Sequence, residues 1–239
     1  MDLSLNVGQG ASTGGLSYKG LQLYHNYKTD ATDKSPKKSN HGVMYTGRSL
    51  AFDGSNDYVR LDGLKIDGNQ MTFALWLKAG GTATQREANN SYLFDFNTNR
   101  TIFGWIGGSE QSLSLHTAGS WSHFGDRPDD GSWHRVVFSI NNTTAQCFVD
   151  GVQLGSDATI TAIDLDLATE SKLGASYSGQ CCFFNGELSN VSIWDKALSA
   201  DVIAYDYNNP QASITDIANQ DDTLDVSNCK LWLALTEGA

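Results

Sequence analysis

The side chains best suited to hold a ligand gather in one glycine- and serine-rich stretch, residues 104–133. Sugar recognition places aromatic rings against the C–H-rich faces of pyranose rings, while amides and carboxylates hold the hydroxyls. This stretch contains both kinds of group, and a second loop, residues 175–183, adds another ring. The candidate ligand-binding residues are Trp105, Trp121, His123, Phe124, Asp126, Arg127 and Tyr177. For Trp121 and Phe124 the alternative is a small hydrophobic cluster beneath a long loop.

A second group with chemical potential is the oxygen-rich segment "DGSND", which contains Asp53, Asn56 and Asp57. Calcium takes six to eight oxygen ligands, usually including several carboxylates. The same residues also suit a tight turn in which Asx side chains bond to the backbone, and we favour that interpretation. The loop "NTNR" adds Asn97 and Asn99, but amides alone bind calcium poorly. The sequence therefore requires no cofactor, and calcium is the one that we keep as an alternative.

Charge and hydropathy exclude several classes of partner. The formal net charge of −11 argues against a phosphate-binding surface, because such a surface needs clustered Lys and Arg. The one basic cluster, Lys34, Lys37 and Lys38, is short and fits a solvated loop. No stretch approaches the ~20 apolar residues that cross a bilayer. We expect neither nucleic-acid binding nor a membrane span.

The cysteines and the N-terminal residues bear on where the chain is made. The four cysteines, Cys147, Cys181, Cys182 and Cys229, are too few for a disulfide scaffold and lack zinc-site spacing. If Cys181 and Cys182 lay on a strand, their side chains would point to opposite faces. We expect reduced, structural cysteines. The start, "MDLSLNVGQGASTGG", has neither the basic residues nor the apolar core of a signal peptide, so we expect synthesis in a cytoplasm.

The elements that must position these groups are mostly strands. Period-two alternation recurs at 71–79 and 132–140, and 24 glycines against 3 prolines favour frequent turns. Asp150-Gly151 lies between β-prone residues and predicts a hairpin, because a type I′ turn needs positive φ at both central positions. Two more short strands are expected on either side of the turn Asp53-Gly54. The stretch 107–132 is weakly patterned, and such a length is either a functional loop or unrecognised strand.

The segment "FNGELSNVSIWDKALSADVI", residues 184–203, predicts a strand followed by a helix. Val191 and Ile193 alternate into the core, but Leu188 lies three positions before Val191. If Leu188 is also buried, a β-bulge near Ser189-Asn190 must reset the facing. Ser199 is a suitable N-cap for one short helix near 199–206. Alternating leucines in "CKLWLALTEG" predict a final strand near the C-terminus.

Several segments in this order resemble the laminin-G-like and pentraxin-like jelly rolls of the concanavalin A-like lectin/glucanase superfamily. They are "LAFDGSNDYVRL" (50–61), "MTFALWLK" (71–78), "DGSWHRVVFSI" (130–140), "FVDGVQLG" (148–155), "KLGAS" (172–176) and "FNGELSNVSIWDKALSADVI" (184–203). Residues 20–42 are similar to the opening strand and loop of that family. The resemblance implies an all-β, two-sheet antiparallel jelly-roll sandwich, with ligands on the concave face or at loop edges. We expect a single domain over 1–239, with its core at 20–205 and a C-terminal extension at 206–239.

The resemblance also raises the questions of calcium and of catalysis. Pentraxin-like members bind calcium through a cluster of Glu, Gln and Asp residues just after a Leu-Gly that corresponds to Leu173-Gly174. Here the following residues, 175–178, contain no carboxylate, which puts that site in doubt. Glycoside hydrolases of the superfamily place two carboxylates across one cleft. Asp164 and Asp166 share a face of "DLDLATE", but the pattern then breaks.

The sequence does not support other catalytic arrangements either. Asp221, Asp222 and Asp225 lie in a polar connection, and the Ser, His and Asp of "WSHFGDRPDD" lack a strained nucleophile elbow. We therefore expect no enzyme. We expect a lectin-like recognition module displayed in a larger surface assembly, most simply a bacteriophage virion as a capsid decoration, fibre or tail component.

The partner would then be a glycan or a neighbouring structural protein, in a homo-oligomer or a particle, at the virion surface. The alternatives are a free-standing lectin and, less favoured, a glycoside hydrolase.

Overall fold

The computed structural model describes residues 49–62, 64, 66, 68–80, 90–96, 101–106, 111–163 and 170–234. The chain divides after residue 46, and all of the described residues belong to the second unit, residues 47–239. The opening strand expected in 20–42 and the lysines at 34, 37 and 38 lie outside the described residues, as do Asn97 and Asn99.

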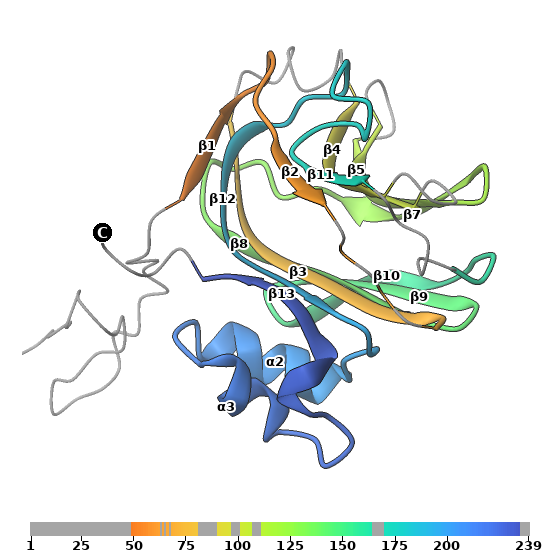
Figure 1. Ribbon diagram of the computed structural model, residues 1–239, viewed down its shortest axis with the longest axis vertical. Helices are drawn as coiled ribbons and strands as arrows, with labels where there is room; N and C mark the ends of the chain where they lie inside the picture. Colours follow the sequence, from red (N-terminus) through yellow and green to blue (C-terminus); the bar gives the residue numbers. More distant parts are fainter. Residues whose placement is uncertain are drawn as a thin grey trace, which may run out of the picture. The chain divides into compact units, whose positions relative to one another are not determined.

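Strands of the described residues build two antiparallel sheets (Figure 1). The seven-stranded sheet has the order β1 (Leu50–Asp53), β12 (Asn185–Trp194), β3 (Gln70–Ala79), β8 (His134–Asn141), β9 (Thr144–Val149) and β10 (Val152–Thr159), with β13 (Cys229–Leu233) beside β12. The six-stranded sheet has the order β2 (Val59–Asp62), β11 (Glu170–Leu173), β4 (Ser91–Phe96), β5 (Thr101–Trp105), β6 (Ser112–Thr117) and β7 (Ser120–Asp126). The predicted all-β, two-sheet sandwich is confirmed.

The main core fills the space between the two sheets. Phe73 of β3 packs against Phe94 and Phe103 of the six-stranded sheet, with ring centroids 5.3 and 5.1 Å apart. Phe138 of β8 continues the stack at 5.2 Å from Phe103. Fully buried side chains of this size each stabilise the fold by about 1.5–3 kcal/mol. The alternation predicted for 71–78 therefore sends its aromatic and leucine face to this core.

The predicted turns at Asp150-Gly151 and Asp53-Gly54 are both present. Asp150 and Gly151 both have positive φ, 54° and 78°, and they join β9 to β10 as the sequence indicates. The strands on either side of Asp53-Gly54 do not form a hairpin. β1 pairs with β12 in one sheet, while β2 pairs with β11 in the other, so this turn carries the chain between the layers.

The bulge predicted in β12 is confirmed. Leu188, Val191 and Ile193 are all fully buried. The pairing of β12 with β3 shifts between Ser189 and Ser192, so that one extra residue resets the facing. Without this shift Leu188 and Val191 could not share the same face.

Helices cover the outer face of the seven-stranded sheet (Figure 1). α2 (Ala200–Asn208) is capped by Ser199, whose side chain accepts the N–H of Val202 as expected from the sequence. A second helix, α3 (Ile214–Ala218), and a 3₁₀ turn, η2 (Val226–Asn228), lie in the segment expected to be a polar connection. The signal for α3 was a capping box, in which Ser213 and Asp216 exchange side-chain and backbone bonds.

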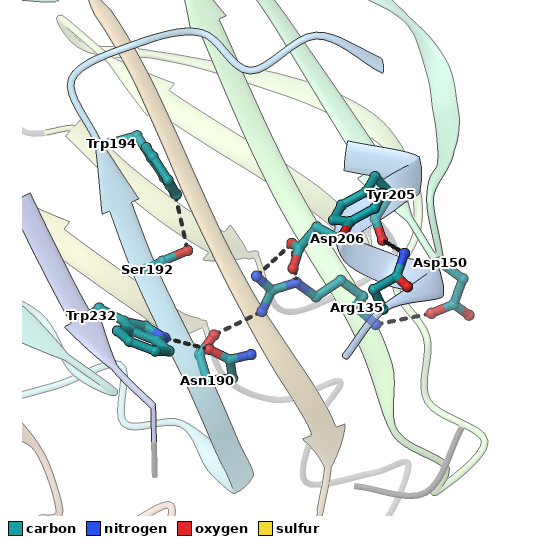
Figure 2. A network of polar contacts seen from close by, with 9 residues as sticks. Arg135, Asp150, Asn190, Ser192, Trp194, Tyr205, Asp206 and Trp232 are labelled. Carbon is teal, nitrogen blue, oxygen red and sulfur yellow. Dashed lines mark hydrogen bonds and ion pairs between the residues drawn. The ribbon is translucent and has the colours of Figure 1, made fainter. Parts of the chain in front are cut away.

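A buried polar network fastens α2 to the sheet (Figure 2). Arg135 of β8 and Asp206 of α2 form an ion pair, with Nη2–Oδ2 2.7 Å and Nε–Oδ2 2.8 Å. Arg135 Nη1 also donates to the carbonyl of Asn190, 2.7 Å away, at the bulge of β12. The Asn190 amide oxygen in turn accepts the indole N–H of Trp232 on β13 at 2.8 Å. The Arg135 side chain thus joins β8 to α2 and β12, and the Asn190 side chain joins β12 to β13.

Candidate ligand-binding face

Strand register sets a row of side chains across the outer face of the six-stranded sheet. Successive side chains alternate between the faces of a strand, and the neighbours of this row, such as Phe94, Phe103 and Leu115, point into the core. The paired positions across the sheet, in order, are Arg60, Lys172, Asp95, Ile102, His116 and Trp121. A second row contains Tyr92, Gly104, Ser114 and His123.

Three aromatic rings meet on this face. The Trp121 ring lies edge-on to that of His116, with centroids 5.0 Å apart, and 6.1 Å from that of Tyr92. Tyr92 reaches Trp121 from β4 across β5 and β6, where the intervening positions of its row are the small Gly104 and Ser114. Tyr92 is buried and Trp121 is partly exposed, so the indole is the ring that a ligand can reach.

Gly104 is required by the close approach of β4. A Cβ atom at this position would lie 2.2 Å from the carbonyl oxygen of Ser91 and 3.0 Å from the Cα atom of Tyr92. The pairing of β4 with β5 shifts between Tyr92 and Phe94, which is the same point of the sheet. The bulge aims Tyr92 at the outer face while Leu93 and Phe94 fill the core.

A hydroxyl–imidazole cluster lies beside the rings. The Ser114 hydroxyl is 2.8 Å from His123 Nδ1, and the Ser112 hydroxyl is 3.1 Å from the same atom. Ser114 also donates to the carbonyl of Ser112 at 2.9 Å. Both serines are buried, whereas His123 is exposed. The exposed imidazole can donate and accept, which suits it to sugar hydroxyls, while the buried serine hydroxyls hold its Nδ1 atom in place. We call Tyr92, Ser112, Ser114, His116, Trp121 and His123 the aromatic face.

The same sheet carries a charged pair at its other end. Asp95 Oδ2 accepts the backbone N–H of Tyr177 at 2.9 Å, and Lys172 Nζ donates to the carbonyl of Tyr177. The Lys172 ammonium also lies 5.1 Å from the centroid of the exposed Tyr58 ring. These contacts hold the loop that follows β11 against β4.

The structure divides the sequence-predicted ligand residues into two groups. Trp121 and His123 belong to the aromatic face, Asp126 is exposed and paired with Ser112, and Tyr177 lies at the charged end of the sheet. The other three are corrections. Trp105 and Phe124 point into the core, and Arg127 is 5% exposed with its guanidinium 5.1 Å from the Trp105 ring.

Of the two alternatives for the stretch 107–132, unrecognised strand is the correct one over most of its described part, because residues 112–126 form the hairpin β6–β7. Leu113 and Leu115 alternate with serines, and the turn Ala118-Gly119 has positive φ at both positions, 46° and 91°. Alanine is uncommon there, so the turn signal was weak. Tyr92, Ser112 and Ser114 were missed as site residues because their pairing partners lie on other strands.

The segment "DGSND" adopts the turn that we favoured. Asp53 Oδ1 accepts the N–H of Ser55 at 2.7 Å, and Asp57 Oδ2 accepts the N–H of Asp53 at 3.0 Å. Within the described ranges, no three His, Cys, Asp or Glu side chains are grouped to hold a metal ion. Calcium at Asp53, Asn56 and Asp57 stays a prediction.

Only some of the carboxylates considered for catalysis lie within the described residues. Asp164 and Asp166 lie outside the described residues. Asp221 accepts the N–H and hydroxyl of Thr223, and Asp225 caps η2, so both serve local turns. Hydrogen bonds of this kind lower the pKa of both carboxyl groups.

Two surface hollows lie on the other sheet and its helices. One, of about 350 Å³, is lined by Ser139, Asn141, Thr144, Gln146, Ala197, Leu198 and Ser199. The other, of about 300 Å³, is lined by Ser213, Ile214, Thr215, Val226, Cys229, Lys230, Leu231 and Trp232. The first lacks an aromatic ring, and in the second the Trp232 ring is not joined by a cluster like that of Ser114 and His123. No helix among the described residues is long and apolar enough to cross a membrane.

Comparison with known proteins identifies the family. The profile of the concanavalin A-like lectin/glucanases superfamily matches residues 53–204, which is well over half of the chain. The chain belongs to this superfamily. A search of curated proteins finds no match. The superfamily fold agrees with the two sheets and with the order of the segments that first indicated it.

Solved structures of the superfamily fold are similar at low sequence identity. A native heptameric SAP-like pentraxin from Limulus polyphemus is 16% identical, with a TM-score of 0.52 over 69% of this chain and 84% of the pentraxin. Domain 4 of the arabinanase AbnA from Geobacillus stearothermophilus, in complex with arabinotriose, is 20% identical, with a TM-score of 0.51 over 70% and 82%. A candidate carbohydrate binding protein from Bacteroides ovatus is 15% identical, with a TM-score of 0.55 over 78% and 51%.

Proposed function

We propose that this protein is a non-catalytic carbohydrate-binding module whose site is the aromatic face. The observation that carries the proposal is the partly exposed Trp121 ring, held between His116 and Tyr92 and placed beside the cluster of Ser114 and His123. A sugar needs one apolar platform and several adjacent polar groups, and this face provides both on paired strands.

The rigidity of the face supports binding without rearrangement. Tyr92, Ser112 and Ser114 are buried and hydrogen-bonded or packed within the sheet, so their positions are fixed before a ligand arrives. Preorganisation of this kind lowers the entropic cost of binding. Two structural neighbours support the choice of ligand class, since one was solved with arabinotriose and another is described as a candidate carbohydrate binding protein.

The carboxylates support a passive rather than a catalytic role. A retaining glycosidase needs two carboxyl groups about 5–5.5 Å apart, one of which must reach the anomeric carbon. Among the carboxylates on the strands of this sheet whose side chains the structure describes, Asp95 is fully buried, and its Oδ2 is already bonded to the N–H of Tyr177. Asp126 lies on the edge strand β7, three strands from Asp95 on β4.

The binding proposal is tested by a glycan array, followed by calorimetric titration of the strongest hit and of arabinotriose. Trp121→Ala should weaken binding by about tenfold or more, because losing ~1.4 kcal/mol of ring contact changes Kd by that factor. Trp232→Ala is the matched control, since this ring is 42% exposed but lies on β13 of the other sheet. Equal affinity of the wild type and the Trp121 variant, or a loss confined to the Trp232 variant, would place the site elsewhere.

The proposal that the protein does not hydrolyse its ligand is tested separately with the same oligosaccharides. We expect no release of reducing ends by the wild-type chain. Hydrolysis that is abolished by Asp164→Asn or Asp166→Asn would make the protein a glycoside hydrolase instead.

We further infer that the module is displayed in a larger surface assembly, and a bacteriophage virion remains our proposed setting. This proposed setting is supported by the acidic sequence, in which no group of catalytic residues is recognised. Mass spectrometry of purified particles and light scattering of the isolated chain test this setting and the proposed homo-oligomer. A monomeric chain that is absent from particles would favour the free-standing lectin.

A further inference from the structure

Two neighbouring thiols converge in the loop between β11 and β12. The Sγ atoms of Cys181 and Cys182 are 2.7 Å apart, which is only about 0.7 Å longer than a disulfide bond. Adjacent side chains on a strand point to opposite faces, but here neither residue is in a strand. Cys182 has a positive φ of 63°, and this backbone turn brings both sulfurs to the same side.

The backbone on both sides of the pair is held in place. The carbonyl of Cys181 accepts the N–H of Ser176 at 3.1 Å, and that of Cys182 accepts the N–H of Tyr92 at 3.0 Å. The unfavourable φ of a non-glycine residue is therefore maintained by bonds to two separate segments. The two thiols are held close together rather than meeting by chance motion of a free loop.

The two cysteines also differ in accessibility, and this difference sets the order in which they would react. Cys181 is exposed, whereas Cys182 is half-buried, and its burial and the adjacent Cys181 thiol raise the pKa of Cys182 to about 12. The remaining cysteines serve as internal controls. Cys147 is buried, which raises the pKa of its thiol, and Cys229 donates to the carbonyl of Leu231 with a pKa raised to about 11 by burial.

We propose that Cys181 and Cys182 are a redox modification site that closes reversibly to a vicinal disulfide. With glutathione disulfide as oxidant, the Cys181 thiolate attacks one sulfur and releases the first glutathione. The Cys182 sulfur then displaces the second glutathione from Cys181 and forms the Cys181–Cys182 bond. The two protons lost by the cysteines are taken up by the two glutathione thiolates, so the chain loses two electrons and glutathione disulfide gains them.

This bond is easily reduced for a geometric reason. Consecutive Cα atoms are about 3.8 Å apart across a trans peptide, below the 4.4–6.8 Å usual for disulfides. Strained disulfides have higher potentials and belong to the labile or regulatory class. The pair therefore stays reduced in a cytosol and closes in an oxidising compartment. Closure fixes the backbone where Cys182 holds Tyr92, and the modification itself does not rest on the proposed sugar binding.

The test uses the full chain, treated with excess glutathione disulfide, quenched with acid, alkylated after denaturation and digested with trypsin. Cleavage after Lys172 and Lys196 yields one peptide that contains both cysteines, while Cys147 and Cys229 fall in other peptides. We expect most of this peptide to lack two hydrogens and to resist alkylation, with both thiols restored by dithiothreitol. The peptides of Cys147 and Cys229 should remain alkylated.

The matched variants distinguish ring closure from simple thiol reactivity. Cys182→Ser should stop at a mixed disulfide between Cys181 and glutathione, because no second thiol can resolve it, and circular dichroism confirms that the variant folds. In the wild type, a persistent mixed disulfide, a disulfide-linked dimer or an unreacted pair of thiols would each overturn the proposal.

Discussion

Replacing Asp206 by alanine should cause a large loss of stability, because it leaves a charge stranded in the interior. The Arg135 side chain is 1% exposed and that of Asp206 5% exposed, and they are joined at 2.7 and 2.8 Å. In Asp206→Ala the guanidinium keeps only the carbonyl of Asn190 as an acceptor among the contacts of Figure 2. Removing one partner of a buried pair costs about 3–5 kcal/mol. That is a large part of the roughly 5–15 kcal/mol by which domains are stable.

The assay is guanidinium unfolding of the full chain, followed by tryptophan fluorescence and evaluated by linear extrapolation. Asp201→Ala is the matched control, since Asp201 is an exposed aspartate on the same helix and should cost about 0.3–1 kcal/mol through the helix dipole. The double variant Arg135→Met/Asp206→Leu should recover most of the loss, because apolar residues of similar volume often replace a buried pair without cost. A loss below about 1 kcal/mol for Asp206→Ala would refute this account, since the pair would then contribute no more than a surface ion pair.

Two further predictions concern pH and the aromatic face. Burial of the His134 ring lowers its pKa, but bonds to Asp130 at 3.0 Å and Asp150 at 2.7 Å raise it by more, so the net shift is upward from 6.5. The stability that protonated His134 contributes is therefore fully present below pH 6.5 and is lost as the pH rises through its raised folded-state pKa. The free energy of unfolding should be lower at about pH 8.5 than at about pH 6, and His134→Gln should remove this difference. An equal difference in the wild type and the variant would contradict the assignment. Gly104→Ala should lower stability by about 1–3 kcal/mol and weaken sugar binding, because its Cβ would lie 2.2 Å from the Ser91 carbonyl oxygen. Unchanged thermal unfolding of this variant would show that β4 can move away freely.

Much of the fold could be predicted because its signals are local. The Asp150-Gly151 turn, the Ser199 cap and the bulge implied by Leu188 and Val191 each depend on residues close together in the sequence. The hairpin β6–β7 was missed because its turn, Ala118-Gly119, uses an uncommon alanine at positive φ. The sequence around Trp105 and Trp121 does not distinguish their roles, yet Trp105 points into the core and Trp121 points outward. Which face of a strand each side chain occupies depends on pairing with strands far along the chain.

The aromatic face depends on pairing that no short window contains. Tyr92 and Trp121 are separated by two strands of the sheet, and their rings meet only because the register places Gly104 and Ser114 between them. The convergence of the Cys181 and Cys182 thiols was likewise missed, since only the strand conformation was considered for the direction of their side chains. A positive φ at Cys182 instead places both sulfurs on the same side.

The helices support our choice of the six-stranded sheet for the proposed ligand face. On the seven-stranded sheet, Ala74, Val137 and Trp194 point outward, but α2 and α3 pack over them and complete a second hydrophobic cluster. The β12 segment that best identifies the superfamily is therefore buried on both faces, which suits it to support rather than to recognition. On the six-stranded sheet, outward positions such as Asp95, Ile102 and Tyr92 are buried, but at the β6–β7 edge His116 and Trp121 are partly exposed and His123 is exposed. One sheet carries the helices, and the edge of the other presents the groups on which the proposed sugar site rests.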